Sequence, residues 1–242
     1  MIDFEKMCER PQQAAQVRAG LVAKTFKLVY GWMALGLVLS GAVAWLTATF
    51  AAENPELLKT LLTGPVFYGL VIAELVLVVV LGAAIDKLSV GAALLMFFGY
   101  AALNGVTLSF VFFALRLATL MQVFFIAAGM FGGLALWGTF TREDLSSVGS
   151  FCGMALWGLV LAGLVNIFVA SSALDWVCSI AGVLIFTGLT MYDAQKIRQI
   201  AARESQMDKA SLGRVSILGA LSLYLDFVNL FLYLLRLMGR RR

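Results

Sequence analysis

Long runs of apolar residues, separated by short polar segments, follow one another along the whole chain. Seven of these runs reach the length of about 20 residues that a helix needs to cross roughly 30 Å of hydrocarbon. The runs lie near residues 28–50, 65–85, 90–115, 118–140, 147–170, 174–192 and 215–238. The pattern predicts an all-α integral membrane protein with seven transmembrane helices.

The polar segments between the runs are too short to fold as a separate soluble domain. We expect a single membrane domain over residues 28–238, preceded by a polar segment (1–27) and followed by a short basic tail (239–242). The longest predicted connection covers residues 193–214. The sequence shows no internal repeat, which weakens an interpretation as an inverted-repeat transporter.

The last run carries a stripe of polar side chains. Five of them recur at intervals of 4, 3, 4 and 3 positions: Ser222, Asp226, Asn229, Tyr233 and Arg236. This spacing places all five on one face of a helix, and a polar face is costly in contact with lipid. We therefore expect the last helix to be enclosed by the other six. Asp226 and Arg236 lie about 15 Å apart along such a helix, so each needs another partner. Glu74 is a candidate partner for Arg236.

Two further acidic residues stand out, in the second and sixth runs. Glu74 lies in mid-membrane, where a structural anchor bonded to another helix is the ordinary alternative to a functional role. Asp193 is either an ordinary helix-end aspartate near the surface, with Lys196 following closely, or a partner of Asp226. The second option requires the sixth helix to continue well beyond Tyr192.

A meeting of Asp193 and Asp226 would have a specific chemical consequence. Two carboxylates a few ångströms apart in a dry site cannot both ionise cheaply, so the pair shares a proton. Hard oxygen ligands also suit Ca²⁺, so protons and calcium would compete for one site. In the third run, Asn104 and Thr107 share a helix face, for which helix–helix hydrogen bonds are the default interpretation.

Composition supports the membrane assignment and narrows the chemistry. The chain is 62% hydrophobic and 13% charged, with a mean hydropathy of +0.94. Ordinary soluble domains are about 45–50% apolar and roughly 25% charged. The net charge of +4 is explained by basic residues that flank membrane spans, so no nucleic-acid partner is expected. With no His and no CxxC spacing among Cys8, Cys152 and Cys178, zinc and iron–sulfur sites are not expected either.

The distribution of Lys and Arg predicts the orientation. Residues 1–27 and 193–214 each hold five basic residues, whereas the connection between the fifth and sixth runs holds none. The N-terminus is therefore expected to be cytoplasmic. Arg236 and the arginines at 240–242 conflict with this rule, which leaves two alternatives: a last helix that crosses, or a re-entrant one with both termini inside. The length of the run favours a crossing.

Several segments resemble one protein family. They are residues 191–197 (MYDAQKI), 222–231 (SLYLDFVNLF), 103–109 (LNGVTLS), 144–151 (DLSSVGSF) and 164–168 (LVNIF). Together they resemble helices three, five, six and seven of the Bax inhibitor family, also called the transmembrane Bax inhibitor motif family. The short termini resemble its bacterial branch, which implies a multi-pass protein of the bacterial inner (plasma) membrane.

The resemblance implies seven helices with the last one enclosed, and a pH-sensitive calcium leak. It assigns the family's aspartate pair to Asp193 and Asp226, its helix-two glutamate to Glu74 and its helix-seven arginine to Arg236. One departure concerns the end of helix two, where some bacterial members carry an arginine that latches onto the pair. This chain has Ile-Asp-Lys at 85–87, so Lys87 is the candidate substitute.

These observations lead to one main hypothesis and two alternatives. The main hypothesis is a proton-gated, calcium-selective cation leak without a cofactor, whose partners are the bilayer, calcium and protons. The first alternative is a non-conducting regulator that binds membrane proteases or cell-death proteins. The second is a presenilin-like intramembrane aspartyl protease, suggested by Tyr192 and Asp193. That enzyme class requires Gly-x-Gly-Asp where residues 223–226 have Leu-Tyr-Leu-Asp, and a Pro-Ala-Leu element that the chain lacks. We therefore predict that the protein is not an enzyme.

Overall fold

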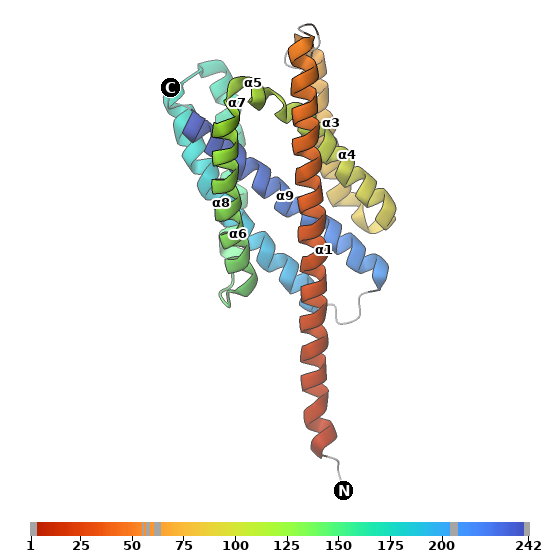
Figure 1. Cartoon of the computed structure of the whole chain (residues 1–242). Coiled ribbons are helices and arrows are strands. Elements are labelled where there is room, and N and C mark those ends of the chain that lie inside the picture. Colours follow the sequence, from red (N-terminus) through yellow and green to blue (C-terminus); the bar gives the residue numbers. More distant parts are fainter. Residues whose placement is uncertain (1–3, 55, 57–58, 61–63, 204–207, 240–242) are drawn as a thin grey trace.

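The computed structural model describes residues 4–54, 56, 59–60, 64–203 and 208–239, and over these ranges it is helical, without strands (Figure 1). The helices are α1 (Phe4–Glu53), α3 (Pro65–Ala84), α4 (Val90–Leu108), α5 (Phe110–Ala114), α6 (Leu117–Phe140), α7 (Ser146–Val169), α8 (Ser172–Arg203) and α9 (Lys209–Gly239). A 3-10 turn, η1 (Ile85–Lys87), follows α3. Seven helical segments are long and apolar enough to cross a membrane, and each matches one of the predicted runs, two of which extend one residue beyond their segment. The chain is a multi-pass membrane protein.

The sixth membrane helix differs most from its predicted length. It was expected to end near Tyr192, but α8 continues to Arg203. The extension is amphipathic: Ala194, Ile197 and Ala201 recur at helical spacing and are buried. This apolar face stabilises the helix beyond the membrane run, so most of the predicted connection over residues 193–214 is helical.

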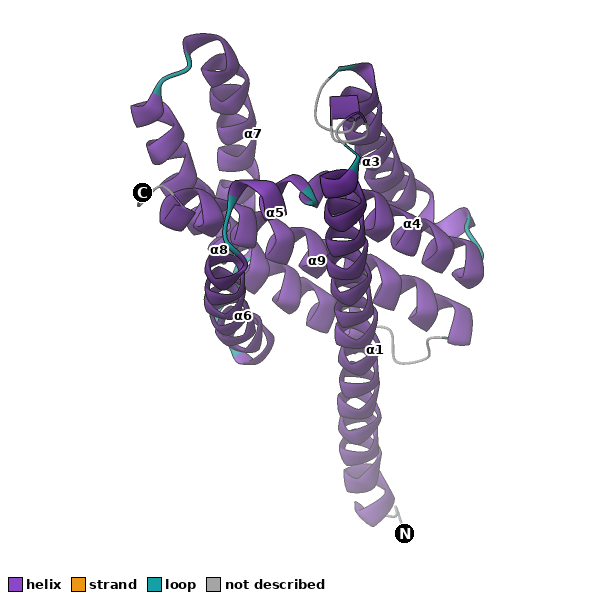
Figure 2. Ribbon diagram, turned by 45° about the horizontal axis from the view of Figure 1, so that its top comes forward, coloured by secondary structure: helices purple, strands orange, loops and turns teal. Residues whose placement is uncertain are grey.

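The last helix lies at the centre of the bundle. In the most apolar window of α9, 61% of the residues are buried, compared with 39% at most in the other six spans. α9 packs directly against α1, α4, α6 and α8, while α3 packs on α4 and α7 packs on α8. Figure 2 shows α9 passing behind α1 and across the bundle. The prediction of an enclosed last helix is confirmed, and α9 is one continuous helix rather than a re-entrant pair.

Two glycines let α8 approach its neighbours closely just before Asp193. A Cβ atom at Gly138 of α6 would collide with the backbone of Met191, and one at Gly149 of α7 would collide with the ring of Tyr192. Small residues are what allow helix backbones to come together inside a membrane. These contacts fix the height and rotation of α8 at the position where it presents its aspartate.

Candidate functional site

Asp226 is a buried carboxylate at the middle of the central helix. It is only 4% exposed, and one of its oxygens, Oδ2, has no hydrogen-bond partner among the described residues. A buried polar group without a partner costs free energy, and most such groups in folded proteins are bonded. An exception of this kind needs an explanation, and a role in binding a proton or a cation is one.

Asp193 of α8 faces Asp226 from the neighbouring helix. The two carboxylates interact electrostatically. The Ser222 hydroxyl, one turn before Asp226 on α9, and the ammonium group of Lys196 both lie close to Asp193. The extension of α8 past Tyr192 makes this meeting possible, since it carries Asp193 along the buried flank of α9. The structure thus brings together the two aspartates that the sequence could pair only by resemblance.

A small cavity of about 70 Å³ between α8 and α9 reaches Asp193. Asp193, Lys196 and Ser222 line it on the polar side, and Ile200 and Val215 line it towards the end of the bundle where α8 and α9 connect. Asp193 is half-buried and reaches this cavity, whereas Asp226 lies deeper. The two carboxylates therefore differ in their access to solvent, with Asp193 the outer member.

The composition of the site limits the metal that it could hold. The described residues contain no cluster of three or more His, Cys, Asp or Glu side chains with metal-binding geometry. Ca²⁺ takes six to eight oxygen ligands, so a calcium ion here would bind two carboxylates and draw its other ligands from hydroxyl, backbone or water oxygens. Such a site suits transient passage of an ion better than tight storage.

Glu74 belongs to a separate polar cluster that joins α3, α4, α9 and α1. The hydroxyl of Thr107 donates to Glu74 Oε1 at 2.8 Å. The Tyr224 hydroxyl donates to Asn104 Oδ1 at 3.0 Å and lies 2.6 Å from the Ser40 hydroxyl. Each of these groups has a partner on a neighbouring helix. The expected hydrogen-bonding role of Asn104 is thus observed, and Glu74 is bonded to α4.

Arg236 lies away from Glu74, so the expected pairing of these two residues is replaced by other contacts. Its guanidinium lies 5.3 Å from the centroid of the Tyr233 ring. It also lines a cavity of about 460 Å³ together with Asn166 of α7 and Asp175 of α8. The ten-residue separation from Asp226 along α9 therefore places Arg236 in a different part of the bundle, among residues of α7 and α8.

The remaining predicted site residues lie outside the pair. Lys87 is exposed in η1. The cation that interacts with Asp193 is instead Lys196, which lies on α8 as Asp193 does. Lys87 as a latch stays a prediction. Asn229 donates from Nδ2 to the carbonyl of Leu225 at 2.8 Å, within its own helix.

Three polar side chains that the sequence analysis did not assign hold the helix ends around the site. Gln195 donates to the carbonyl of Glu143 at 2.7 Å and accepts from the amide of Leu145 at 2.9 Å. Arg198 donates to the carbonyl of Thr139 at 2.7 Å, and Arg214 donates to that of Leu88 at 2.9 Å. They tie α8 and α9 to neighbouring turns. A sequence signal exists only for Gln195, an amide on the apolar face of α8.

Ser40 and Tyr224 were also missed. Tyr224 precedes Asp226 by two positions, so it points away from the polar stripe on which the prediction was based. Ser40 is one of several hydroxyl residues in the first apolar run, and small hydroxyl residues are common in membrane helices. Only the packing of α1 against α9 shows that the two hydroxyls meet.

Comparison with known proteins gives consistent matches over nearly the whole chain. Residues 22–242 match the model of a family described as "Inhibitor of apoptosis-promoting Bax1". The chain is 46% identical over 234 residues to the inner membrane protein YbhL of Escherichia coli, covering 96% of this chain and 98% of that protein. It is 43% identical over 212 residues to a Deinococcus radiodurans protein, covering 88% of each chain. A Borreliella burgdorferi protein is 40% identical over 215 residues, covering 88% of this chain and 90% of that protein.

Proposed function

The chain belongs to the Bax inhibitor family, and from this premise we propose that it is a pH-sensitive, calcium-permeable cation leak gated by Asp193 and Asp226. The observation that carries the proposal is the buried oxygen of Asp226, which lies beside a second carboxylate and lacks a hydrogen-bond partner in the described part of the chain. Intramembrane carboxylates of this kind are costly and mark proton or ion pathways in membrane proteins.

The proposed gating rests on the charge of the pair. With a shared proton, the two carboxylates repel each other less, and α8 and α9 pack closely. Loss of that proton places two negative charges side by side, which favours either separation of the helices or entry of a cation between them. Protonation thus shifts the population between a closed and a conducting form.

The orientation and location of the protein are part of the proposal. The basic residues of the first segment and of the α8–α9 connection support a cytoplasmic N-terminus, because positive charge collects on that side. In this orientation the small cavity beside Asp193 opens towards the cytoplasm. The description of the Escherichia coli relative as an inner membrane protein supports the bacterial inner membrane as the location.

The decisive experiment measures calcium flux into liposomes that contain the purified protein, across roughly neutral pH. We expect a pH-dependent flux that loses its pH dependence in Asp193→Asn and in Asp226→Asn. Asp86→Asn, which removes an exposed carboxylate in η1, is the matched control and should keep the wild-type profile. An unchanged pH profile in both pair variants would contradict the gating mechanism.

The description of the matched family favours a second candidate, a non-conducting regulator of other membrane proteins. Such a protein would need an exposed basic surface for its partners. The basic segment over residues 193–214 could supply one, but Arg198 and Arg214 of that segment donate to backbone carbonyls of this chain. The regulator becomes the better explanation if the folded protein gives no flux above that of empty liposomes.

A further inference from the structure

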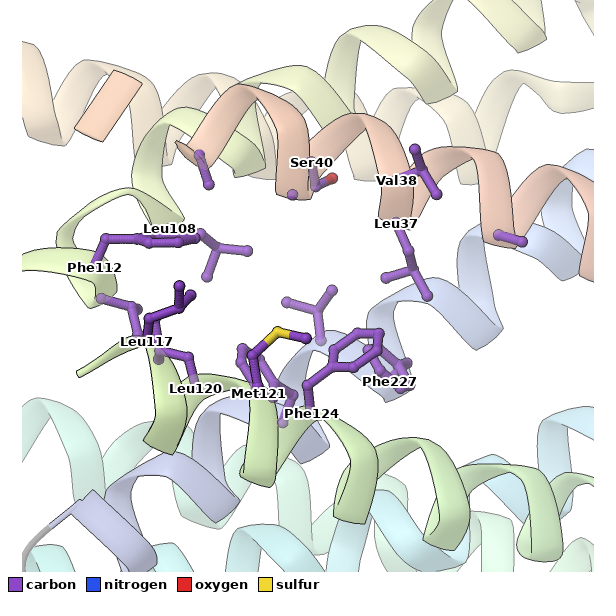
Figure 3. Close-up of a pocket in the computed structure, with 16 residues that line it drawn as sticks. Leu37, Val38, Ser40, Leu108, Phe112, Leu117, Leu120, Met121, Phe124 and Phe227 are labelled. Carbon is purple, nitrogen blue, oxygen red and sulfur yellow. The ribbon is translucent and has the colours of Figure 1, made fainter. Parts of the chain in front are cut away.

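A large apolar cavity opens on the side of the bundle, between α1 and α6. Its volume is about 440 Å³, which falls within the range of roughly 300–1,000 Å³ that is usual for ligand pockets. Leu37 of α1, Phe112 of α5, and Met121 and Phe124 of α6 form its walls (Figure 3). Phe227 and Val228 of α9 form its floor.

The residues that line the cavity offer water almost no hydrogen-bonding groups. Ser40 is the single hydroxyl-bearing side chain among the lining residues, and its oxygen already contacts the carbonyl of Ala101 at 2.7 Å and the hydroxyl of Tyr224 at 2.6 Å. A buried water needs two to four polar partners, and apolar cavities stay dry. An empty cavity of this size would forfeit a large amount of dispersion energy. An apolar occupant is therefore favoured over water or a void.

The cavity is continuous with the lipid-facing surface. At its rim, Val38 is 69% exposed and Leu117 is 61% exposed, and both belong to membrane-spanning segments. At its floor, Phe227 and Val228 are at most 5% exposed. The gap between α1 and α6 is thus a lateral passage from the bilayer to the central helix. The chemistry available at its mouth is that of lipid acyl chains.

A positive charge lies next to the mouth. Arg116 is exposed and directly precedes Leu117, the first residue of α6 and a lining residue. A guanidinium pairs well with a phosphate oxygen. We propose that an anionic phospholipid binds here, with one acyl chain in the cavity against α9 and its phosphate near Arg116.

This site is separate from the proposed ion site but touches the same helix. Phe227 and Val228 immediately follow Asp226, so the acyl chain would pack against the turn that carries the inner carboxylate. The lipid is a constituent of the bundle in this proposal, since it completes the wall between α1 and α6. The inference does not depend on whether the protein conducts calcium.

The test uses the full chain in liposomes of phosphatidylglycerol that carry a diazirine in the middle of the acyl chain. After illumination, the labelled residues are mapped by mass spectrometry. We expect adducts at Phe227 and Val228, in addition to those at Phe125, which is 65% exposed and serves as the reference for general lipid contact. Labelling of Phe125 without labelling of α9 would overturn the proposal.

Two glycines of α1 provide a matched pair of variants. Gly41 lines the cavity, Gly31 does not, and a Cβ atom at either position would meet nothing within 4 Å. Gly41→Leu should fill the mouth and lower α9 labelling several-fold relative to Phe125, whereas Gly31→Leu should leave the ratio unchanged. Equal α9 labelling in both variants would show that the chain does not enter by this passage.

The headgroup part of the proposal has its own measurement. Diazirine-labelled phosphatidylcholine, with the same acyl chains and no net charge, should label α9 less than phosphatidylglycerol does. Arg116→Gln should remove that difference between the two lipids. Equal labelling by the two lipids in the wild-type protein would overturn the assignment of an anionic lipid.

Discussion

Two acidic side chains of the membrane spans, the half-buried Glu74 of α3 and the buried Asp226 of α9, have opposite surroundings. Glu74 accepts a hydrogen bond from Thr107, and its neighbours Asn104, Tyr224 and Ser40 form a chain of hydrogen bonds across α4, α9 and α1. Asp226 instead faces a second carboxylate, and over the residues that the structure describes one of its oxygens has no hydrogen-bond partner. The first cluster has the composition of a structural anchor. The second keeps two carboxylates close together, which is unfavourable when both are charged. The proposed response to pH requires an arrangement of this kind.

The largest effect on stability is expected from breaking the bonded cluster. Asn104→Leu should lower the free energy of unfolding by about 1–3 kcal/mol, because Tyr224 loses a buried acceptor and a neighbour of Glu74 is removed. Unfolding of the purified protein in detergent would measure this loss. Asn229→Leu is the control, since its amide bonds within its own helix, and it should cost less.

A smaller loss is expected at the other end of the same cluster. Ser40→Ala removes the hydroxyl that joins α1 to Tyr224 and to the carbonyl of Ala101, which should cost about 0.5–1.5 kcal/mol. Ser216→Ala is a matched comparison, because the Ser216 hydroxyl is also buried but bonds only to Leu212 of its own helix. Equal losses of stability in the two variants would mean that the contacts of the Ser40 hydroxyl with neighbouring helices add nothing to the free energy of unfolding.

The aspartate pair should respond in the opposite direction. Asp226→Asn removes a buried charge without removing a protein hydrogen bond at Oδ2, so it should leave stability unchanged or raise it by up to about 1 kcal/mol. The same unfolding measurement at mildly alkaline pH tests this. A loss as large as that of Asn104→Leu would show that Asp226 is an anchor and would remove the contrast between the two clusters.

The smallest effect is expected at an exposed carboxylate that begins the same helix as Asp226. Asp208 accepts from the amide of Ser211 at 2.9 Å, and its bonds to Ser211 hold the pKa of this carboxyl below its usual value. A lowered pKa stabilises the helix start above the unfolded value of about 4, and this contribution is lost as pH falls through the folded value. Hydrogen-exchange protection of the first amides of α9 should therefore fall in acid in the wild type and stay level in Asp208→Asn.

The sequence was sufficient for the helices and insufficient for the geometry of the site. Apolar run length identifies membrane spans because lipid permits few alternatives, and all seven predicted spans are present. The spacing of Asp226 and Asn229 indicated correctly that α9 is enclosed. The end of α8 could not be placed, since residues 193–203 mix charges with the small apolar face at Ala194 and Ala201. The length of α8 alone decides whether Asp193 reaches Asp226.

The partners of buried polar groups were the least predictable feature. Glu74 has several potential partners in the chain, and only the three-dimensional packing selects Thr107 over Arg236. The bond between Ser40 and Tyr224 joins residues 184 positions apart, and no local pattern reports a contact over that distance. Sequence periodicity shows which face of a helix is polar, but not which neighbouring helix that face meets.

The length and slant of α9 give the protein a dependence on bilayer thickness. At 31 residues, α9 is about 46 Å long, well beyond the roughly 30 Å of a typical hydrocarbon core. In Figure 1 it runs obliquely to α1, and tilting is one way in which a helix longer than the hydrocarbon core fits a bilayer. A thicker bilayer draws such a helix upright and a thinner one tilts it further. Since Asp226 lies near the middle of α9 and Asp193 on a different helix, a change in tilt moves one carboxylate past the other. We therefore expect lipid chain length to act as a mechanical input to the pair.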